Sequence, residues 1–242
     1  MVRPNQRHDA GPLMTTPAPA NAAGGPWFRS PRNLIVLALA LVAVIVGVFV
    51  VVNRDSDRSG SATAKVGSGP NKTLADYFAA SNITQTPIRP GEPGTPTITI
   101  PLPPGWSDAG SDTPSGAYAE ILYDDATNPD DVPFVEVLLS RLEGPADPAQ
   151  VLEYAPGELK NLPDYQSVSE PMTSKLSGFD AVQLAGLYTK DGEGRLIAQK
   201  TVVIPSGEGL FVLQMNADAP TADAPALQLA TVVIDEQARI EG

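Results

Sequence analysis

The chain contains no cysteine among its 242 residues and a single histidine, His8. Without cysteine there is no disulfide, no thiolate ligand for a metal and no acyl chain attached through a cysteine. His8 lies near the N-terminus, which leaves no histidine for general base catalysis in the rest of the chain. Histidine and cysteine metal sites are excluded there for the same reason.

Basic side chains are scarce in the C-terminal two thirds of the sequence. The residues after Asn71 include 9 lysines and arginines against 25 aspartates and glutamates, which gives a net charge of −16. The residues before Asn71 include 7 basic and 3 acidic side chains, a net charge of +4. A strongly acidic surface repels nucleic acid and anionic lipid head groups. We therefore expect no nucleic-acid partner.

One long apolar run, Leu34 to Val52, contains no charged residue and no proline. Its 19 residues reach about 28 Å as a helix, close to the thickness of a bilayer's hydrocarbon core. Arg29 and Arg32 precede the run, so the positive-inside rule places Met1 in the cytoplasm. The sequence predicts a single-pass cell-membrane protein with an extracytoplasmic C-terminal domain.

A secretory signal peptide is the alternative interpretation of this run. Arg29 and Arg32 would then form its basic region, and Ala62 to Ala64 resembles a small-residue cleavage site. A signal's apolar core is usually about 7 to 15 residues, shorter than this run. Either interpretation exports the downstream domain.

Composition divides the chain into four parts. Residues 1–33 are rich in proline, alanine and glycine and predict a disordered cytoplasmic tail. After the transmembrane segment 34–52, the Gly/Ser-rich residues 53–71 predict a flexible linker. The remaining residues, 72–242, are enough for one domain with a buried core.

Three helices are predicted in this domain from their capping residues. Thr73 and Asp76 form a capping-box pair ahead of a helix over residues 73–81. Asp147-Pro148 opens a second helix that ends near Pro156, followed by one further turn at 158–162. Asp223 caps a helix over residues 224–239, and its expected buried stripe is Ala226, Ala230, Val233 and Ile234.

Alternating apolar residues predict six strands, at residues 97–102, 117–123, 134–142, 179–188, 196–204 and 210–216. Asp191-Gly192 is a turn signal between the fourth and fifth strands. The order of helices and strands predicts an α+β fold, an antiparallel sheet covered by helices.

Several stretches also resemble a known family. They are TLADYFAASNIT, PTITIPLPPGW, GELKNLPDY, SGFDAVQLAGLY, AQKTVVIP and LFVLQMNA, and they include the marks Pro101 to Trp106, Asn161 to Pro163, Ser177 to Phe179 and Gln199-Lys200-Thr201. Over residues 72–240 the chain resembles the LpqN/LpqT family of actinobacterial, chiefly mycobacterial, exported lipoproteins.

The resemblance implies a Mog1/PsbP-like fold, an antiparallel sheet between helical layers. It implies an extracytoplasmic cell-envelope protein without established enzymatic activity or cofactor, with proposed links to envelope lipid transport or protein interactions. The chain departs from the lipoprotein members because it has no lipobox cysteine. Leu34 to Val52 would replace the lipid anchor.

Acidic residues cluster in one loop, at Asp124, Asp125, Asn128, Asp130 and Asp131. Hard cations bind several carboxylate and amide oxygens, which makes this loop the best metal candidate. It lacks the regular spacing and central glycine of a calcium loop, so a solvated hairpin end is the simpler interpretation. The acids also suit recognition of a basic partner.

Four large side chains are candidates for binding an apolar ligand: Trp106, Tyr188, Phe211 and Met215. Trp106 follows Pro-Pro-Gly and is expected either at a ligand mouth or as a lid over the core. The other three lie on predicted strands, where aromatic residues are usually part of the core.

The sequence supports three functional hypotheses. The first is a noncatalytic membrane-anchored protein that binds an envelope lipid or a protein partner. The second is a hydrolase of envelope material, for which Glu120 and Glu136 on neighbouring strands are the candidate carboxylates. The third is a structural tether that concentrates its partners near the membrane.

Overall fold

The computed structural model describes residues 69–207 and 209–241. The predicted tail, the predicted membrane segment Leu34 to Val52 and most of the predicted linker lie outside these residues. No helix within the described ranges has the length and apolarity needed to cross a bilayer.

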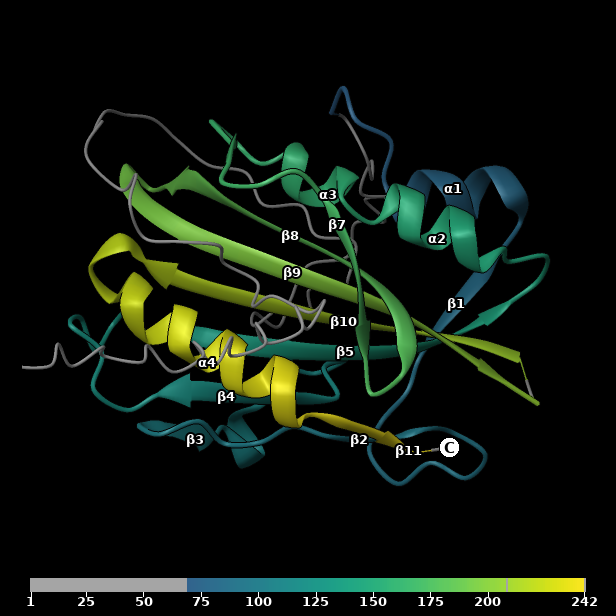
Figure 1. The fold of residues 1–242 in the computed structure, drawn as a ribbon, viewed down its shortest axis with the longest axis horizontal. Coiled ribbons are helices and arrows are strands. Elements are labelled where there is room, and N and C mark those ends of the chain that lie inside the picture. Colours follow the sequence, from purple (N-terminus) through teal and green to yellow (C-terminus); the bar gives the residue numbers. More distant parts are fainter. Residues whose placement is uncertain (1–68, 208, 242) are drawn as a thin grey trace, which may run out of the picture.

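A nine-stranded sheet forms the centre of the domain, with the spatial order β3-β4-β5-β10-β9-β8-β6 (Figure 1). Its four long strands are β5 (Phe134–Glu143), β8 (Phe179–Lys190), β9 (Glu193–Ser206) and β10 (Gly209–Pro220). The shorter ones are β3 (Trp106–Asp108), β4 (Ala119–Tyr123) and β6 (Gln166–Ser167), together with β1 (Thr84–Pro87) beside β5 and β7 (Met172–Leu176) beside β8. All pairs are antiparallel, which confirms the predicted α+β architecture.

The β8–β9 hairpin turns at Asp191-Gly192, as its sequence predicts. Lys190 pairs with Glu193, so the two residues between them form the whole loop. Both have positive φ, 53° and 84°, as a type I′ turn requires. The tight turn fixes the register of the two strands.

One face of the sheet packs against α4 (Ala224–Gln237), the yellow helix in Figure 1. The residues beneath it form the larger core cluster, which includes Phe211, Leu213 and Met215 of β10. The predicted helix ends two residues early, and its buried stripe is Leu227, Ala230, Thr231 and Ile234. Ala226 and Val233 were expected in this stripe but are only partly buried, because the helix is rotated toward Leu227.

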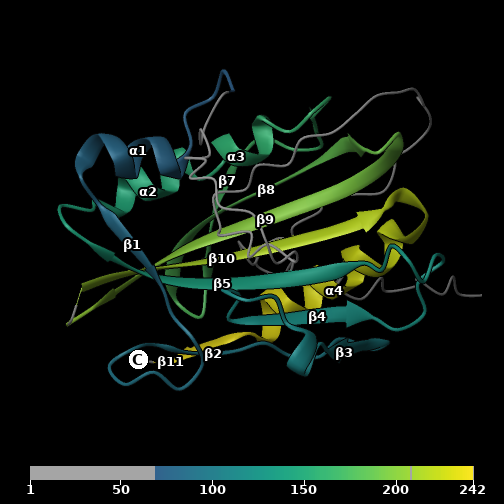
Figure 2. The same ribbon diagram turned by 180° about the vertical axis from the view of Figure 1, so that it is seen from behind.

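The opposite face carries α1 (Leu74–Ser81), α2 (Pro148–Tyr154) and α3 (Gly157–Lys160), with α1 and α2 labelled above the sheet in Figure 2. Thr73 and Asp76 form the predicted capping box of α1. The Asp147 side chain accepts a hydrogen bond from the Ala149 amide at the start of α2. These helices close a second core cluster against Val203 and Val212.

A second, two-stranded sheet joins segments from both ends of the domain. β2 (Thr97–Thr99) pairs with β11 (Arg239–Glu241), and Ile98 lies opposite Ile240. The strand predicted over 97–102 is therefore shorter than expected and stands apart from the main sheet. β1, β3, β6, β7 and β11 are also present where the sequence analysis predicts no strand.

Two short 3-10 helices complete the described chain, Gly110–Asp112 and Thr221–Asp223. Asp223 occupies the position before α4, but its side chain makes no capping hydrogen bond. Its carboxylate instead accepts hydrogen bonds from the amide and the hydroxyl of Thr127, the latter at 2.6 Å. Asp223 therefore ties the acidic loop to α4, which differs from its predicted role.

Candidate functional site

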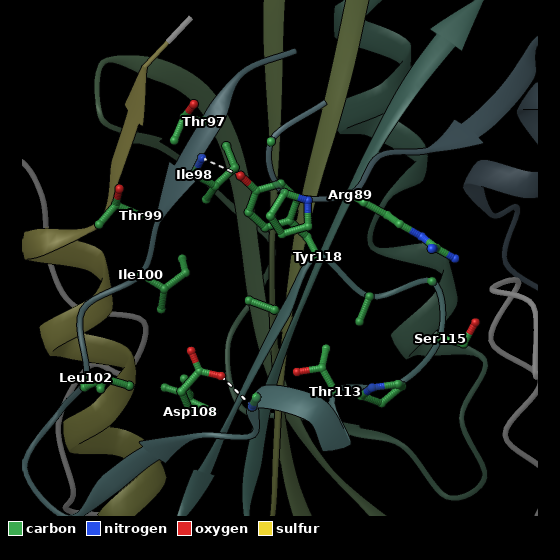
Figure 3. Close-up of a pocket in the computed structure, with 18 residues that line it drawn as sticks. Arg89, Thr97, Ile98, Thr99, Ile100, Leu102, Asp108, Thr113, Ser115 and Tyr118 are labelled. Atoms are coloured by element: carbon green, nitrogen blue, oxygen red, sulfur yellow. Dashed lines mark hydrogen bonds between the residues drawn. The ribbon is translucent and has the colours of Figure 1, made fainter. Parts of the chain in front are cut away.

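A groove of about 1000 Å³ opens between β2, the 3-10 helix Gly110–Asp112 and β4 (Figure 3). Its apolar lining includes Ile98, Ile100, Leu102, Tyr118 and Ile121. Pockets that bind small amphipathic molecules have volumes of about 300 to 1000 Å³ and a mainly apolar lining. The groove is therefore large enough for a small amphipathic ligand.

The alternation of β2 places its side chains around this groove. Ile98 is buried, while Thr97 and Thr99 are exposed on either side of it. The Ile98 amide donates a hydrogen bond of 3.1 Å to the Tyr118 hydroxyl, drawn as a dashed line in Figure 3. This bond holds β2 against the segment that leads into β4.

Leu102 is the most exposed apolar side chain of the groove, with 55% of its surface accessible. It follows β2 in a proline-rich segment, which has no amide hydrogen to donate at Pro101, Pro103 and Pro104. A large apolar side chain left in water beside an apolar groove indicates a surface that gains free energy when it is covered.

The groove is bordered by one basic and one acidic side chain, Arg89 and Asp108, which lie on different sides of it in Figure 3. The Arg89 amide donates to the Glu92 carboxylate at 2.6 Å, which shapes the loop before β2. Asp108 accepts from the Gly110 amide at 2.7 Å and fixes the start of the 3-10 helix. The border thus offers polar contacts at the edges of an apolar lining.

The four large side chains predicted to bind a ligand do not line this groove. Trp106, Phe211 and Met215 belong to the core beneath α4, and Trp106 packs against Tyr123 with ring centroids 5.5 Å apart. Tyr188 lies on the other face of the sheet, where its hydroxyl donates to the Asp218 carboxylate at 2.5 Å. The structure does not bring the four together, and Trp106 is itself buried in the core.

The polar side chains of the acidic loop, residues 124–131, form separate interactions with different partners. Asp124 accepts from the Ser107 hydroxyl at 2.6 Å, and Asp131 forms an ion pair with Arg195. The Asp130 amide donates to the Asn128 side chain. Asp125 lies in the same loop and is exposed. No group of three or more acidic or histidine side chains in the described residues is arranged to hold a metal ion.

Glu120 and Glu136 lie directly opposite each other on β4 and β5. Burial, and to a smaller extent the neighbouring Glu136 carboxylate, together raise the pKa of Glu120 from 4.5 to about 7. Burial also raises the pKa of Glu136, while a hydrogen bond from Asn216 opposes this change. At neutral pH the pair can therefore hold a proton that an exposed pair would lose.

Sequence reasoning missed a buried charged cluster at the far end of the sheet. The Arg195 guanidinium donates to Asp218 through Nε at 2.7 Å and also pairs with Asp131. Burial and the Asp218 carboxylate raise the pKa of Tyr188, which keeps its hydroxyl protonated as a donor. Arg195 directly precedes the strand predicted over residues 196–204. A basic residue at the start of an apolar strand was the signal in the sequence for this cluster. The bonding within the cluster indicates a structural role.

A second buried basic side chain, Lys200, pairs with Asp235 of α4. Burial lowers the pKa of Lys200, while the Asp235 carboxylate opposes this change. Ala198 and Val202, two residues before and after Lys200 on β9, belong to the core beneath α4, so strand alternation places this lysine among apolar side chains. The pair connects the sheet to the helix that covers it.

The chain is similar to known proteins over the part that the structure describes. A family model described as "Probable lipoprotein LpqN" matches residues 70–241. The lipoprotein LpqN of Mycobacterium tuberculosis is 46% identical over 173 residues, which cover 72% of this chain and 75% of that protein. A "Proline-rich 28 kDa antigen homolog" of Mycobacterium leprae is 22% identical over 171 residues, covering 69% of this chain and 61% of that protein.

A solved structure supports the same assignment. The crystal structure titled as LpqN involved in cell envelope biogenesis of Mycobacterium tuberculosis matches with a TM-score of 0.68 and 46% identity. The match covers 72% of this chain and all of the solved chain. Both the sequence and the fold of residues 70–241 are thus similar to those of the M. tuberculosis protein, and the chain belongs to the LpqN lipoprotein family.

Proposed function

We propose that this protein is a noncatalytic envelope protein that binds the apolar part of an envelope lipid in the groove beside β2. The observation that carries the proposal is the groove itself, with an apolar lining and the exposed Leu102 at its edge. The M. tuberculosis relative is described as involved in envelope biogenesis, which is the setting where such a lipid would be met. Transport of the lipid, or its presentation to a protein partner, would follow from this binding.

The proposal includes a membrane anchor formed by Leu34 to Val52, with the domain outside the cell. The length and apolarity of this run support it. The absence of cysteine supports it further, because the relatives are lipoproteins and this chain has no cysteine to acylate. A Mog1/PsbP-like arrangement of sheet and helices remains part of the same proposal. With Leu34 to Val52 as the anchor, residues 53–71 act as the spacer between the membrane and the domain.

The test is photo-cross-linking of the full chain in phospholipid nanodiscs with a diazirine-bearing palmitoyl phosphatidylcholine, a zwitterionic lipid that the acidic domain does not repel. We expect label on peptides that contain β2 and the segment through Leu102. Leu102→Asp should reduce this labelling about tenfold, because covering a leucine contributes about 1.5 kcal/mol or more. Leu229→Asp is the matched control, since Leu229 is 71% exposed on α4 and does not line the groove. Equal labelling of both variants would refute lipid binding in the groove.

A carboxylate-dependent hydrolase is the second candidate function, and the facing pair Glu120 and Glu136 favours it. A carboxyl group with a pKa of about 7 suits general acid catalysis at neutral pH. Replacing each glutamate singly by glutamine separates the two functions. Loss of an envelope phenotype with unchanged folding would favour the hydrolase, whereas retention of the phenotype removes its candidate residues.

A simple tether is tested by exchanging the N-terminal segment. Fusion of residues 53–242 to an unrelated transmembrane helix should retain function if the segment only anchors the domain. A loss of function after this exchange would assign a specific role to Leu34 to Val52.

A further inference from the structure

A row of hydrogen-bond acceptors crosses the face of the sheet opposite α4. Glu120, Glu136, Asn216 and Gln199 lie in register on the neighbouring strands β4, β5, β10 and β9. Glu158 of α3 joins them by accepting a hydrogen bond from Gln214, which lies two residues from Asn216 on β10. We use the name acceptor row for the following set of residues: Glu120, Glu136, Glu158, Gln199, Thr201, Gln214 and Asn216. It spans about three strand spacings, roughly 14 Å.

The amide donors of the row are used within the row itself. Gln199 Nε2 donates to Asn216 Oδ1 at 3.0 Å, and Gln214 Nε2 donates to Glu158 Oε2 at 3.3 Å. Asn216 in turn hydrogen-bonds Glu136. The side-chain groups of the row that remain for bonding to a ligand are therefore mainly hydrogen-bond acceptors.

Two buried polar atoms of the row have no hydrogen-bond partner. They are the side-chain oxygen Oε1 of Gln199 and the hydroxyl oxygen of Thr201. Gln199 is 2% exposed and Thr201 is fully buried. A buried polar group without a partner costs about 1 to 3 kcal/mol, which favours a ligand that supplies the missing donor.

The row also contains acidic groups without a basic side chain beside them. Glu120, Glu136 and Glu158 are its three carboxyl groups, and none of its members is lysine or arginine. Burial raises the pKa of Glu136 and Glu158 because no cation within the row offsets their desolvation. Glu120 and Glu136 are only partly buried, so the row is accessible at their end and closed at Thr201.

We infer that the acceptor row binds guanidinium groups, namely those of an arginine-rich segment presented by a protein partner. Guanidinium offers five N–H donors in a plane and no acceptor, which complements carboxylates and an unpartnered amide oxygen. A metal ion fits less well, because the described residues contain no group of three suitable ligands. The net charge of −16 after Asn71 would attract a basic segment over longer distances.

This site is distinct from the lipid groove. Ala119 and Ile121 of β4 line the groove, while Glu120 between them projects to the other face, as strand alternation requires. Binding of the arginine and binding of the lipid can therefore be changed separately. A result that refutes arginine binding at the acceptor row therefore does not refute lipid binding in the groove, and the reverse also holds.

The test measures binding of a fluorescein-labelled tetra-arginine peptide to the full chain in phosphatidylcholine nanodiscs, by fluorescence anisotropy. Glu136→Gln should raise Kd about tenfold, because it removes a charge-assisted acceptor. The matched control is Glu153→Gln, which removes the same charge from the exposed side of α2. We expect a change of less than about twofold for this control.

Three outcomes would overturn the inference. Equal weakening by Glu136→Gln and Glu153→Gln would show nonspecific attraction to an acidic domain. Equal affinity for tetra-lysine would show that a point charge suffices. No weakening by Thr201→Val, which removes the unpartnered hydroxyl at nearly constant shape, would show that the unpartnered atoms of the row take no part in binding. The expected result for Thr201→Val is about threefold weaker binding with an unchanged or raised melting temperature.

Discussion

Replacing Glu120 by glutamine should stabilise the protein at neutral pH and leave it unchanged in acid. The folded chain holds a proton on Glu120 up to a pKa of about 7, whereas the ordinary value is 4.5. Folding is therefore opposed by ionisation of this group as the pH rises from about 4.5 to 7. Glutamine keeps the shape of the protonated side chain and cannot ionise.

The size of the effect follows from the pKa. A pKa difference between 4.5 and about 7 corresponds to roughly 3 kcal/mol if fully expressed. Glu120 is partly exposed, and solvent screening reduces this to about 1 to 2 kcal/mol. Below pH 4 both the folded and the unfolded chain are protonated at this position, so the difference disappears.

Urea denaturation followed by circular dichroism measures this effect at pH 4 and pH 8. We expect Glu120→Gln to raise the free energy of unfolding by about 1 to 2 kcal/mol at pH 8 only. Glu153→Gln on the exposed side of α2 should change it by less than about 0.5 kcal/mol at both pH values. An equal gain at both pH values, or none at pH 8, would refute the assignment of a proton to the Glu120–Glu136 pair.

Further substitutions test the packing around the sites. Asp218→Ala leaves Arg195 buried without its main partner and should lower the free energy of unfolding by about 3 to 5 kcal/mol in urea denaturation. Gly157→Ala places a methyl group 1.9 Å from the Lys72 carbonyl oxygen, so it should lower the melting temperature and detach the start of α1. Ile240→Ala should cost about 2 to 4 kcal/mol and speed hydrogen exchange at Ile98, because the two face each other across the small sheet.

For each of these three substitutions, one result would contradict the prediction. Wild-type stability of Asp218→Ala would mean that Arg195 finds another acceptor. A melting temperature unchanged in Gly157→Ala would show that the Lys72 segment moves freely. Unchanged exchange at Ile98 in the Ile240 variant would show that β2 is held without β11.

Features that depend on neighbouring residues were predictable from the sequence. The capping box of Thr73 and Asp76, the Asp147-Pro148 helix start and the Asp191-Gly192 turn are each defined within four residues, and all three are confirmed. The long strands were also predictable, because their apolar residues alternate. The antiparallel sheet with covering helices followed from their order.

Features that depend on distant residues were not predictable. β1 is a short polar strand, and it forms because Thr84 to Pro87 pair with residues 140–143 of β5. Arg239, the last residue of the predicted C-terminal helix, instead begins β11, because Ile240 pairs with Ile98. No local sequence pattern in these two segments indicates which strand each of them pairs with.

The sites show the same division. Strand alternation was sufficient to suggest that Glu120 and Glu136 face each other, and the register confirms it. The groove was missed because loops and short segments around β2 and the 3-10 helix build most of it. Large side chains such as Phe211 were chosen as ligand contacts on size alone, and the core needs them instead.

The pairing of β2 with β11 also determines when the groove can exist during the life of the chain. Ile98 and Ile240 are 142 positions apart, so the wall of the groove waits for the last residues to be synthesised. A nascent chain that has already formed β3, β4 and β5 still lacks this wall. A chain shortened by a few C-terminal residues would keep β2 as an unpaired edge, which invites association with other unfinished chains. Ligand binding at this groove would therefore distinguish completed molecules from truncated ones.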